Sequence, residues 1–276
     1  MHISVIIPTY NRAHTLARAL DSVLAQTRPA DEIIVIDDGS TDDTRALIEQ
    51  QYPQVTYLYQ GNAGVSAARN HGIKHAQGDW IALLDSDDEW LPKKLAKQST
   101  ALKDDNNYQL CHCDEIWIRN GQHVNAMKKH SKSGGWIFDK CLPLCAISPS
   151  ATMIHKDLFV QVGLFDELLP ACEDYDLWLK ICSQHPVLYV DELLLNKYGG
   201  HDDQLSQQHW GMDRFRITAL DNAIQTLHLK PEDKQAAIHT LIEKTRIFIN
   251  GAIKRQRQDN LDGYYALLSK YGVTYD

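Results

Sequence analysis

The sequence of 276 residues has no run of the roughly 18 apolar residues that a membrane-spanning helix needs. It also shows no basic segment and no cleavage site of a secretory leader, because Met1 leads straight into the apolar stretch ISVIIPTY. We therefore expect a cytoplasmic protein. The short basic stretch IKRQRQ at 253–258 leaves a peripheral contact with the inner face of the membrane as the alternative to an ordinary solvated surface.

Basic residues are too few for a nucleic-acid partner, since 28 Lys and Arg stand against 36 Asp and Glu and give a formal net charge of −8. Acids concentrated in a site favour a divalent cation instead. A second pair of metal ligands is also lacking near the CHC cluster at 111–113, which argues against structural zinc. In a cytosolic chain the six cysteines fit small core residues better than a disulfide framework; they are Cys111, Cys113, Cys141, Cys145, Cys172 and Cys182.

The first part of the chain alternates between apolar runs and helical patterns. Four apolar runs predict strands: SVIIPTYN, IIVIDDGS, VTYLYQ and WIALLD. After the first run, Leu16, Leu20 and Val23 fall on one face of a helix. Ser40 and Asp43 predict a capping box that opens the next helix. This alternation predicts an α/β fold, with a parallel sheet covered by helices.

The pattern changes after about residue 90. Asn120 and Gly121 predict a type I′ turn between two strands, and EDYDLWLKIC predicts a helix with Trp178 facing inward. From about residue 206 the pattern is almost wholly helical. We expect one domain over residues 1–205 and a C-terminal helical extension over residues 206–276. Four apolar residues are expected to pack the extension on the domain rather than to form a binding groove: Trp210, Phe215, Ile217 and Leu220.

Two carboxylate clusters follow apolar runs, in IIVIDDGS at 33–40 and WIALLDSDDEW at 80–90. Ligands bind at the carboxyl edge of a parallel sheet, so these acids stand where a ligand would lie. The DSD tripeptide at 85–87 offers two carboxylates to Mg²⁺ or Mn²⁺. Taken alone it also fits a solvated loop or the nucleophile motif of a haloacid dehalogenase-like phosphatase. Asp88 and Glu89 depart from the phosphatase pattern, which expects Thr or Val two residues after its second Asp.

Six motifs, in order, give a more specific indication. They are SVIIPTYNR (4–12), DEIIVIDDGSTDDT (31–44), GNAGVSAARN (61–70), GDWIALLDSDD (78–88), VGLFDE (162–167) and EDYDLWLK (173–180). In this set the chain resembles the family 2 glycosyltransferases over about residues 3–200. The resemblance implies the GT-A fold, a Rossmann-like mixed sheet with helices on both faces. It also implies a nucleoside-diphosphate-sugar donor, Mn²⁺ or Mg²⁺, and inversion at the anomeric carbon.

The resemblance assigns roles to particular residues. The loop after the first strand would hold the base and ribose of the nucleotide, through Pro8, Thr9, Tyr10, Asn11 and Arg12. The ribose and metal would be handled by Asp85, Ser86 and Asp87, with Asp87 the direct ligand.

Three further positions match the family pattern. Asp38 would contact the base, and Arg69 would lie near the donor diphosphate, where the glycines before it independently predict an anion site at a helix N-terminus. Asp174 would be the catalytic base, with Glu173 beside it. His201, after two glycines, would be a metal or diphosphate ligand in a closing segment.

The chain lacks the Q-x-x-R-W motif and the membrane spans of processive family members. We therefore expect transfer of a single sugar or a short series, from a UDP-sugar to a saccharide, lipid-linked or protein acceptor, in cell-surface polysaccharide or glycoconjugate synthesis. The alternatives are a catalytically silent nucleotide-sugar-binding protein and the phosphatase.

Overall fold

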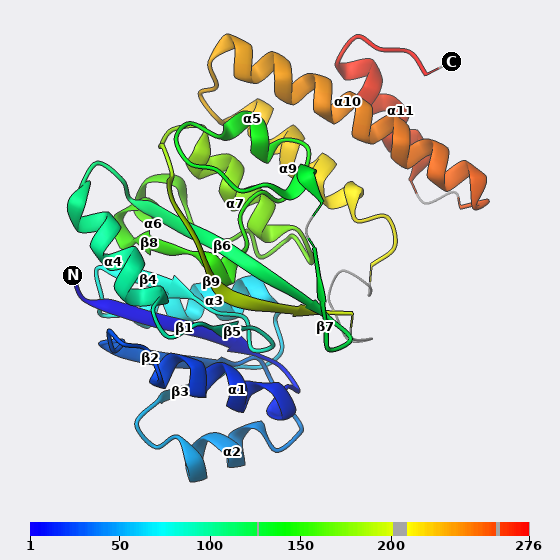
Figure 1. Cartoon of the computed structure of the whole chain (residues 1–276). Helices are drawn as coiled ribbons and strands as arrows, with labels where there is room; N and C mark the ends of the chain where they lie inside the picture. Colours follow the sequence, from blue (N-terminus) through cyan, green and yellow to red (C-terminus); the bar gives the residue numbers. More distant parts are fainter. Residues whose placement is uncertain (126, 201–208, 258–259, 276) are drawn as a thin grey trace.

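The computed structural model describes residues 1–125, 127–200, 209–257 and 260–275 (Figure 1). The strands are β1 (Ile3–Thr9), β2 (Glu32–Asp37), β3 (Thr56–Tyr59), β4 (Trp80–Leu83), β5 (Glu89–Trp90), β6 (Leu110–Arg119), β7 (Gln122–Val124), β8 (Met153–His155) and β9 (Leu188–Gly199). The α-helices are α1 (Ala13–Leu24), α2 (Thr44–Gln51), α3 (Val65–His75), α4 (Lys94–Asp104), α5 (Phe138–Cys141), α6 (Lys156–Val162), α7 (Glu173–Cys182), α9 (Asp213–Thr226), α10 (Pro231–Lys254) and α11 (Leu261–Lys270). No helix within these ranges is both long enough and apolar enough to cross a membrane.

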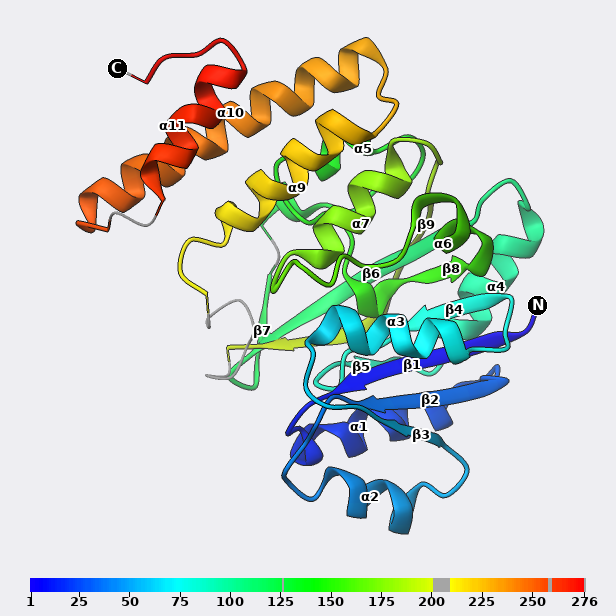
Figure 2. The ribbon, with the colours of Figure 1, turned by 180° about the vertical axis from the view of Figure 1, so that it is seen from behind.

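The first four strands form the parallel part of the sheet, in the order β3-β2-β1-β4. Every residue of β1 is buried, because the strand is central and helices cover both of its faces. Ile3, Val5 and Ile7 face one core, which α1 and α4 cover, and Ile6 faces the other, which α3 and α7 cover (Figures 1 and 2). The predicted α/β architecture is confirmed.

The rest of the sheet is mixed. Strand β8 is antiparallel to β4 and to β6, β9 is parallel to β6, and β5 is antiparallel to β9. The predicted turn between β6 and β7 is confirmed: Asn120 and Gly121 have φ angles of 49° and 73°, as both central residues of a type I′ turn require.

The predicted capping box at Ser40 and Asp43 is wrong. Helix α2 begins at Thr44, and it is the Asp42 carboxylate that accepts the Thr44 amide, at 3.0 Å. Ser40 instead uses its hydroxyl to accept the amide of Asn11, at 2.8 Å. A long-range contact between two loops has therefore replaced a local cap.

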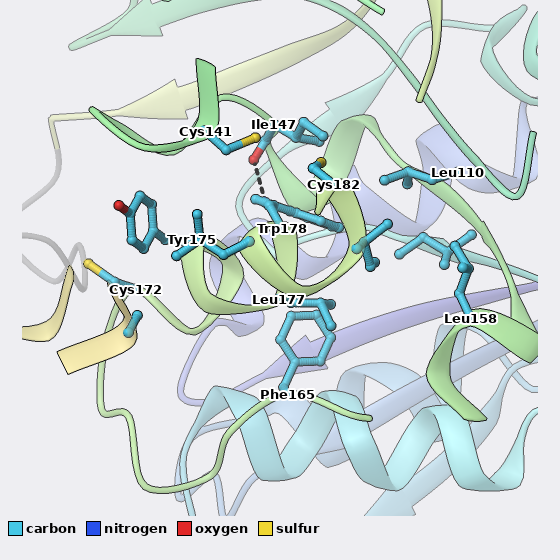
Figure 3. Close-up of a cluster of buried hydrophobic side chains, with 14 of the residues drawn as sticks. Leu110, Cys141, Ile147, Leu158, Phe165, Cys172, Tyr175, Leu177, Trp178 and Cys182 are labelled. Atoms are coloured by element: carbon cyan, nitrogen blue, oxygen red, sulfur yellow. Dashed lines mark hydrogen bonds between the residues drawn. The ribbon is translucent and has the colours of Figure 1, made fainter. Parts of the chain in front are cut away.

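Helix α7 lies in the middle of the larger core (Figure 3). Trp178 is fully buried, as predicted, and its indole Nε1 donates to the carbonyl of Ile147 at 2.9 Å. Helix α9 packs on α7, and its Ile217 and Leu220 are 2 % and 0 % exposed. Trp210 differs from the expectation, because it stacks on Phe248 of α10 with ring centroids 5.2 Å apart. The expected boundary at residues 205 and 206 falls outside the described residues.

Candidate active site

Three loops meet at the carboxyl edge of the parallel strands, after β1, β2 and β4. Strands β2, β1 and β4 are neighbours, so residues 9–12, 37–40 and 85–88 come together although they are far apart in the sequence. The connections after neighbouring strands also lead to opposite faces of the sheet here, because α1 covers one face and α3 covers the other. Such a switch point is where open α/β sheets bind ligands.

The loop after β1 is fixed to the loop after β2. Pro8 and Thr9 end β1 and are buried, whereas Tyr10 is 47 % exposed. Asn11 has a φ of 51°, in the left-handed region that Asn tolerates, and its side-chain Oδ1 accepts the amide of Thr41 at 2.8 Å. Arg12 turns toward the loop after β4, where it contacts Asp87 at 3.1 Å.

Asp38 is buried and holds the glycine-containing segment that precedes α3. Its Oδ1 accepts the amide of Ala63 at 2.9 Å and the Gln60 side chain at 2.7 Å, and its Oδ2 accepts the amide of Gly64 at 2.8 Å. The backbone amides just before α3, where the sequence predicts an anion site, therefore bind the carboxylate of Asp38. The proposed base contact of Asp38 stays a prediction.

The residues after β4 alternate between partly exposed and buried positions. The side chains of Asp85 and Asp87 are 29 % and 21 % exposed, while Ser86 and Asp88 are buried. The partly exposed pair supplies hard carboxylate oxygens, which suit Mg²⁺ or Mn²⁺. Within the described ranges no cluster of three His, Cys, Asp or Glu side chains is close enough to hold a metal alone. His201 lies outside the described residues.

Asp88 connects the loop after β4 to β9 and to Ser150 through hydrogen bonds. Its Oδ1 accepts the amide of Tyr198 in β9 at 2.9 Å, and its Oδ2 accepts the hydroxyl of Ser150 at 2.6 Å. The Ser150 hydroxyl also accepts the amide of Asp85, at 3.1 Å. Burial, followed by the charges of Asp87 and Asp85, raises the pKa of Asp88 well above its usual value. This carboxyl positions the loop rather than presenting itself to solvent.

Arg69 joins the loop after β4 to the start of α7. Its side chain is 4 % exposed, and its two terminal nitrogens donate to Asp85 Oδ1 and Glu173 Oε1, each at 2.6 Å. Burial alone would lower the pKa of Arg69, but Asp85 and Glu173 raise it above its ordinary value. The guanidinium therefore stays charged and holds two carboxylates in place. Its predicted position near the diphosphate is not tested by these contacts.

The two acids at the start of α7 have different surroundings. Glu173 is 4 % exposed and bound to Arg69. Asp174 is partly exposed, and its Oδ1 accepts the amide of Tyr175 at 2.7 Å. Its Oδ2 accepts a hydrogen bond from the Cys145 thiol at 3.1 Å. Burial and then Asp174 raise the pKa of Cys145 well above its usual value, so the thiol remains protonated and donates.

Cys145 corrects the sequence interpretation of the cysteines. All six are free thiols and five are buried, as expected of core residues, but Cys145 is only partly buried and contacts Asp174. Sequence reasoning also missed Ser150 and Tyr198. No local sequence pattern could have found these residues, because each is separated from its hydrogen-bond partner by 29 to 110 positions in the sequence.

Residues 4–142 match the family model described as Glycosyl transferase family 2. The chain is 32% identical over 218 residues to the UDP-Glc:alpha-D-GlcNAc-diphosphoundecaprenol beta-1,3-glucosyltransferase WfgD of Escherichia coli, covering 78% of this chain and 81% of that protein. It is 36% identical over 207 residues to the uncharacterized glycosyltransferase RT0329 of Rickettsia typhi, covering 73% of this chain. The chain spans 65% of the length of RT0329 and 31% of that of a relative from Rickettsia bellii.

Two solved structures share the fold. Residues 1–349 of S. aureus TarS, in complex with UDP-GlcNAc, superpose with a TM-score of 0.71 at 20% identity, over 90% of this chain and 81% of that one. The mannosyltransferase PcManGT from Pyrobaculum calidifontis, in complex with GDP-Man and Mn²⁺, gives a TM-score of 0.64 at 17% identity, over 98% and 79% of the two chains. At such identities the likeness concerns the fold, and it confirms the expected GT-A class.

Proposed function

The chain belongs to glycosyl transferase family 2, and from this premise we propose that it transfers a sugar from a UDP-sugar to an acceptor hydroxyl, with inversion at the anomeric carbon. One observation carries the proposal. A single buried guanidinium, that of Arg69, holds both Asp85 of the DSD loop and Glu173, the neighbour of Asp174. The acids that suit a cation and the acid that suits a base are thereby fixed relative to each other, as a single displacement between donor and acceptor requires.

The comparisons support the choice of donor and acceptor. WfgD is named for UDP-Glc and for an acceptor linked to diphosphoundecaprenol, and TarS is solved with UDP-GlcNAc. We therefore propose a UDP-sugar as the donor and a lipid-linked saccharide as the acceptor. The loop from Pro8 to Arg12, with Asp38, would surround the nucleoside.

The residues of the DSD loop fit a divalent cation. Asp87 and Asp85 would hold Mn²⁺ or Mg²⁺, and His201 is proposed as a further ligand. When bound, the cation supplies positive charge that stabilises the departing diphosphate. Arg12 contacts Asp87 at 3.1 Å and so joins this carboxylate to the loop after β1.

Asp174 is the proposed base, because it is the more exposed of the two acids at the start of α7. Asp174 lies in the first turn of α7, and the Cys145 thiol and the Tyr175 amide both donate hydrogen bonds to its carboxylate, which orients it to take a proton from an acceptor hydroxyl. Glu173 would not touch the substrate. It positions Arg69, and through Arg69 it positions Asp85.

The cation requirement tests this function directly. We expect UDP to bind at least about tenfold more tightly with Mn²⁺ than with EDTA, because Asp85 and Asp87 would hold the cation and its positive charge would attract the diphosphate. The variant Asp87→Ala should lose this dependence without a change in melting temperature. Isothermal titration calorimetry measures both affinities. A suitable control is Asp104→Ala, which removes an exposed acid at the end of α4 and should behave as the wild type.

Equal affinity for UDP in Mn²⁺ and in EDTA would contradict the proposal. So would a Mn²⁺ dependence that survives Asp87→Ala in a folded protein.

A further inference from the structure

A cavity of about 350 Å³ lies beside Asp174, and most of the charged side chains in its lining are basic. The lining includes five basic side chains and one carboxylate, that of Glu115, and the basic residues are Lys129, Lys132, Lys140, Lys197 and Arg216. This concentration of positive charge contrasts with the net charge of −8 on the whole chain. The contrast points to an anionic ligand.

The single carboxylate in the lining does not cancel the positive charge. Glu115 lies 3.3 Å from Lys132, and both side chains are almost fully buried. Burial would raise the pKa of Glu115, but Lys197 and Lys132 lower it to about 2, so the carboxylate is ionised at neutral pH and offsets one charge. Asp213, outside the lining, is shared by Arg216 at 3.0 Å and Lys244 at 3.2 Å. A surplus of cations remains in the cavity.

The cavity adjoins the proposed catalytic groups. Cys145 is part of the lining and donates to Asp174. Lys197 is also part of the lining, binds the Ser148 hydroxyl at 2.7 Å, and interacts electrostatically with Asp88 and Asp85. An acceptor whose hydroxyl reaches Asp174 would therefore place its neighbouring groups in or near this cavity.

A second cavity, of about 540 Å³, has Arg216 in common with the lining of the first. We call it the aromatic groove; its apolar lining consists of Trp210, Met212, Ile247 and Phe248. Trp210 stacks on Phe248, and Gly211 passes so close to this ring that a Cβ atom there would lie 2.7 Å from it. Arg255 and Arg257 also line the groove, as does Asp213, whose carboxylate is paired with Arg216 and Lys244. An apolar groove with arginines suits a hydrocarbon chain that ends in phosphate.

We propose that the cationic cavity binds the phosphate or diphosphate group of a lipid-linked acceptor and that the aromatic groove binds the first part of its hydrocarbon chain. The proposal rests on the transfer reaction proposed above and assigns its acceptor side to named residues. The phosphate contacts Lys132, Lys197 and Arg216, the chain runs over Trp210 and Phe248, and the sugar extends toward Asp174. The helices α9 and α10 then have a function in acceptor binding.

The test uses two simple probes and the full chain, saturated with UDP and Mg²⁺ so that the donor side is occupied. Inorganic phosphate and n-octyl phosphate are titrated separately at constant ionic strength by calorimetry. We expect a single site for phosphate, and binding of octyl phosphate that is tighter by about tenfold because part of the chain is buried. Phosphate should not slow the hydrolysis of the UDP-sugar, since it binds away from the donor.

Three variants assign the contacts. Arg216→Gln should weaken phosphate binding about tenfold, and Lys140→Ala, at the exposed rim, about threefold. The matched control is Lys97→Ala, because Lys97 is also an exposed lysine with one polar partner, Glu192 at 2.7 Å. Ile247→Ser should weaken octyl phosphate alone, and its side chain is 63 % exposed, so the fold should tolerate the change. Melting temperatures verify that each variant is folded.

The outcomes separate this proposal from the proposed function. If UDP binds with its cation but phosphate does not bind, or binds equally to wild type, Lys140→Ala and Arg216→Gln, the cationic cavity is not an acceptor site and the transfer reaction still stands. If octyl phosphate binds no more tightly than inorganic phosphate, the assignment of the groove to a lipid chain is overturned. If UDP fails to bind while phosphate does so as described, the proposed donor reaction is the part that fails.

Discussion

At the scale of single residues, exposure separates the roles of two adjacent acids. Glu173 and Asp174 are consecutive at the start of α7, yet only Asp174 is partly open to solvent. The Cys172 residue before them has a φ of 62°, so the chain turns sharply as it enters the helix. Consecutive side chains of an α-helix point about 100° apart, so one carboxylate meets Arg69 and the other meets Cys145.

Replacing Asp174 tests its role as the base. We expect Asp174→Asn to reduce kcat by at least about 100-fold, because general-base catalysis contributes about 10²- to 10⁴-fold. The affinity for UDP with Mn²⁺ should stay within about twofold of wild type, since the base acts on the acceptor. The amide oxygen can still accept the Tyr175 amide, so the helix start should be preserved. Steady-state transfer assays and calorimetry give the two values.

Asp157→Asn is the matched control, because Asp157 also lies in the first turn of a helix and its side chain is 68 % exposed. Transfer by Asp174→Asn within about threefold of wild type would place the base elsewhere.

At the scale of elements, Arg69 is the link between α3, the loop after β4 and α7. Removing Arg69 should therefore lower the stability of the fold as well as the rate of transfer. We expect Arg69→Met to lower the free energy of unfolding by about 3–5 kcal/mol, since buried Glu173 would lose its partner. Urea denaturation measures the change, with Arg45→Met as the control. Arg45 pairs with Glu49 on the surface of α2, where water screens the pair, so its loss should lower the free energy of unfolding far less.

A cost for Arg69→Met close to that of Arg45→Met would show that the buried pair does not hold α7 to the sheet.

The sequence predicts the elements better than the contacts between them. Strand ends, the type I′ turn and the inward face of α7 follow from local patterns, because periodicity and turn chemistry act over a few residues. The capping box fails because Ser40 finds a partner 29 positions away. The carboxylate of Asp38 and the thiol of Cys145 likewise have partners that only the folded chain brings near. Motifs locate the candidate site, and the structure supplies its internal hydrogen bonds.

At the scale of the whole molecule, the C-terminal helices share a core with the α/β part. Figure 2 shows α9 lying against α7, with α10 and α11 beyond it. Leu220 and Ala223 of α9 belong to the same buried cluster as Trp178 of α7 and Ile154 of β8. A cluster continuous across these elements predicts one cooperative unfolding transition rather than two.

Truncating Leu220 measures how strongly the extension is joined to the sheet. Its side chain is fully buried, so Leu220→Ala should lower the free energy of unfolding by about 2–5 kcal/mol through lost apolar burial and the cavity left behind. The same substitution at Leu168, which is 90 % exposed, should cost less than about 0.5 kcal/mol. Urea denaturation followed by tryptophan fluorescence and by circular dichroism provides the measurement, and the two signals should change together. If Leu220→Ala instead produced an early transition of the helices alone, with the α/β part still folded, the extension would be an independent domain. The aromatic groove, which residues of both α9 and α10 line, would then depend on a contact weaker than the buried cluster predicts.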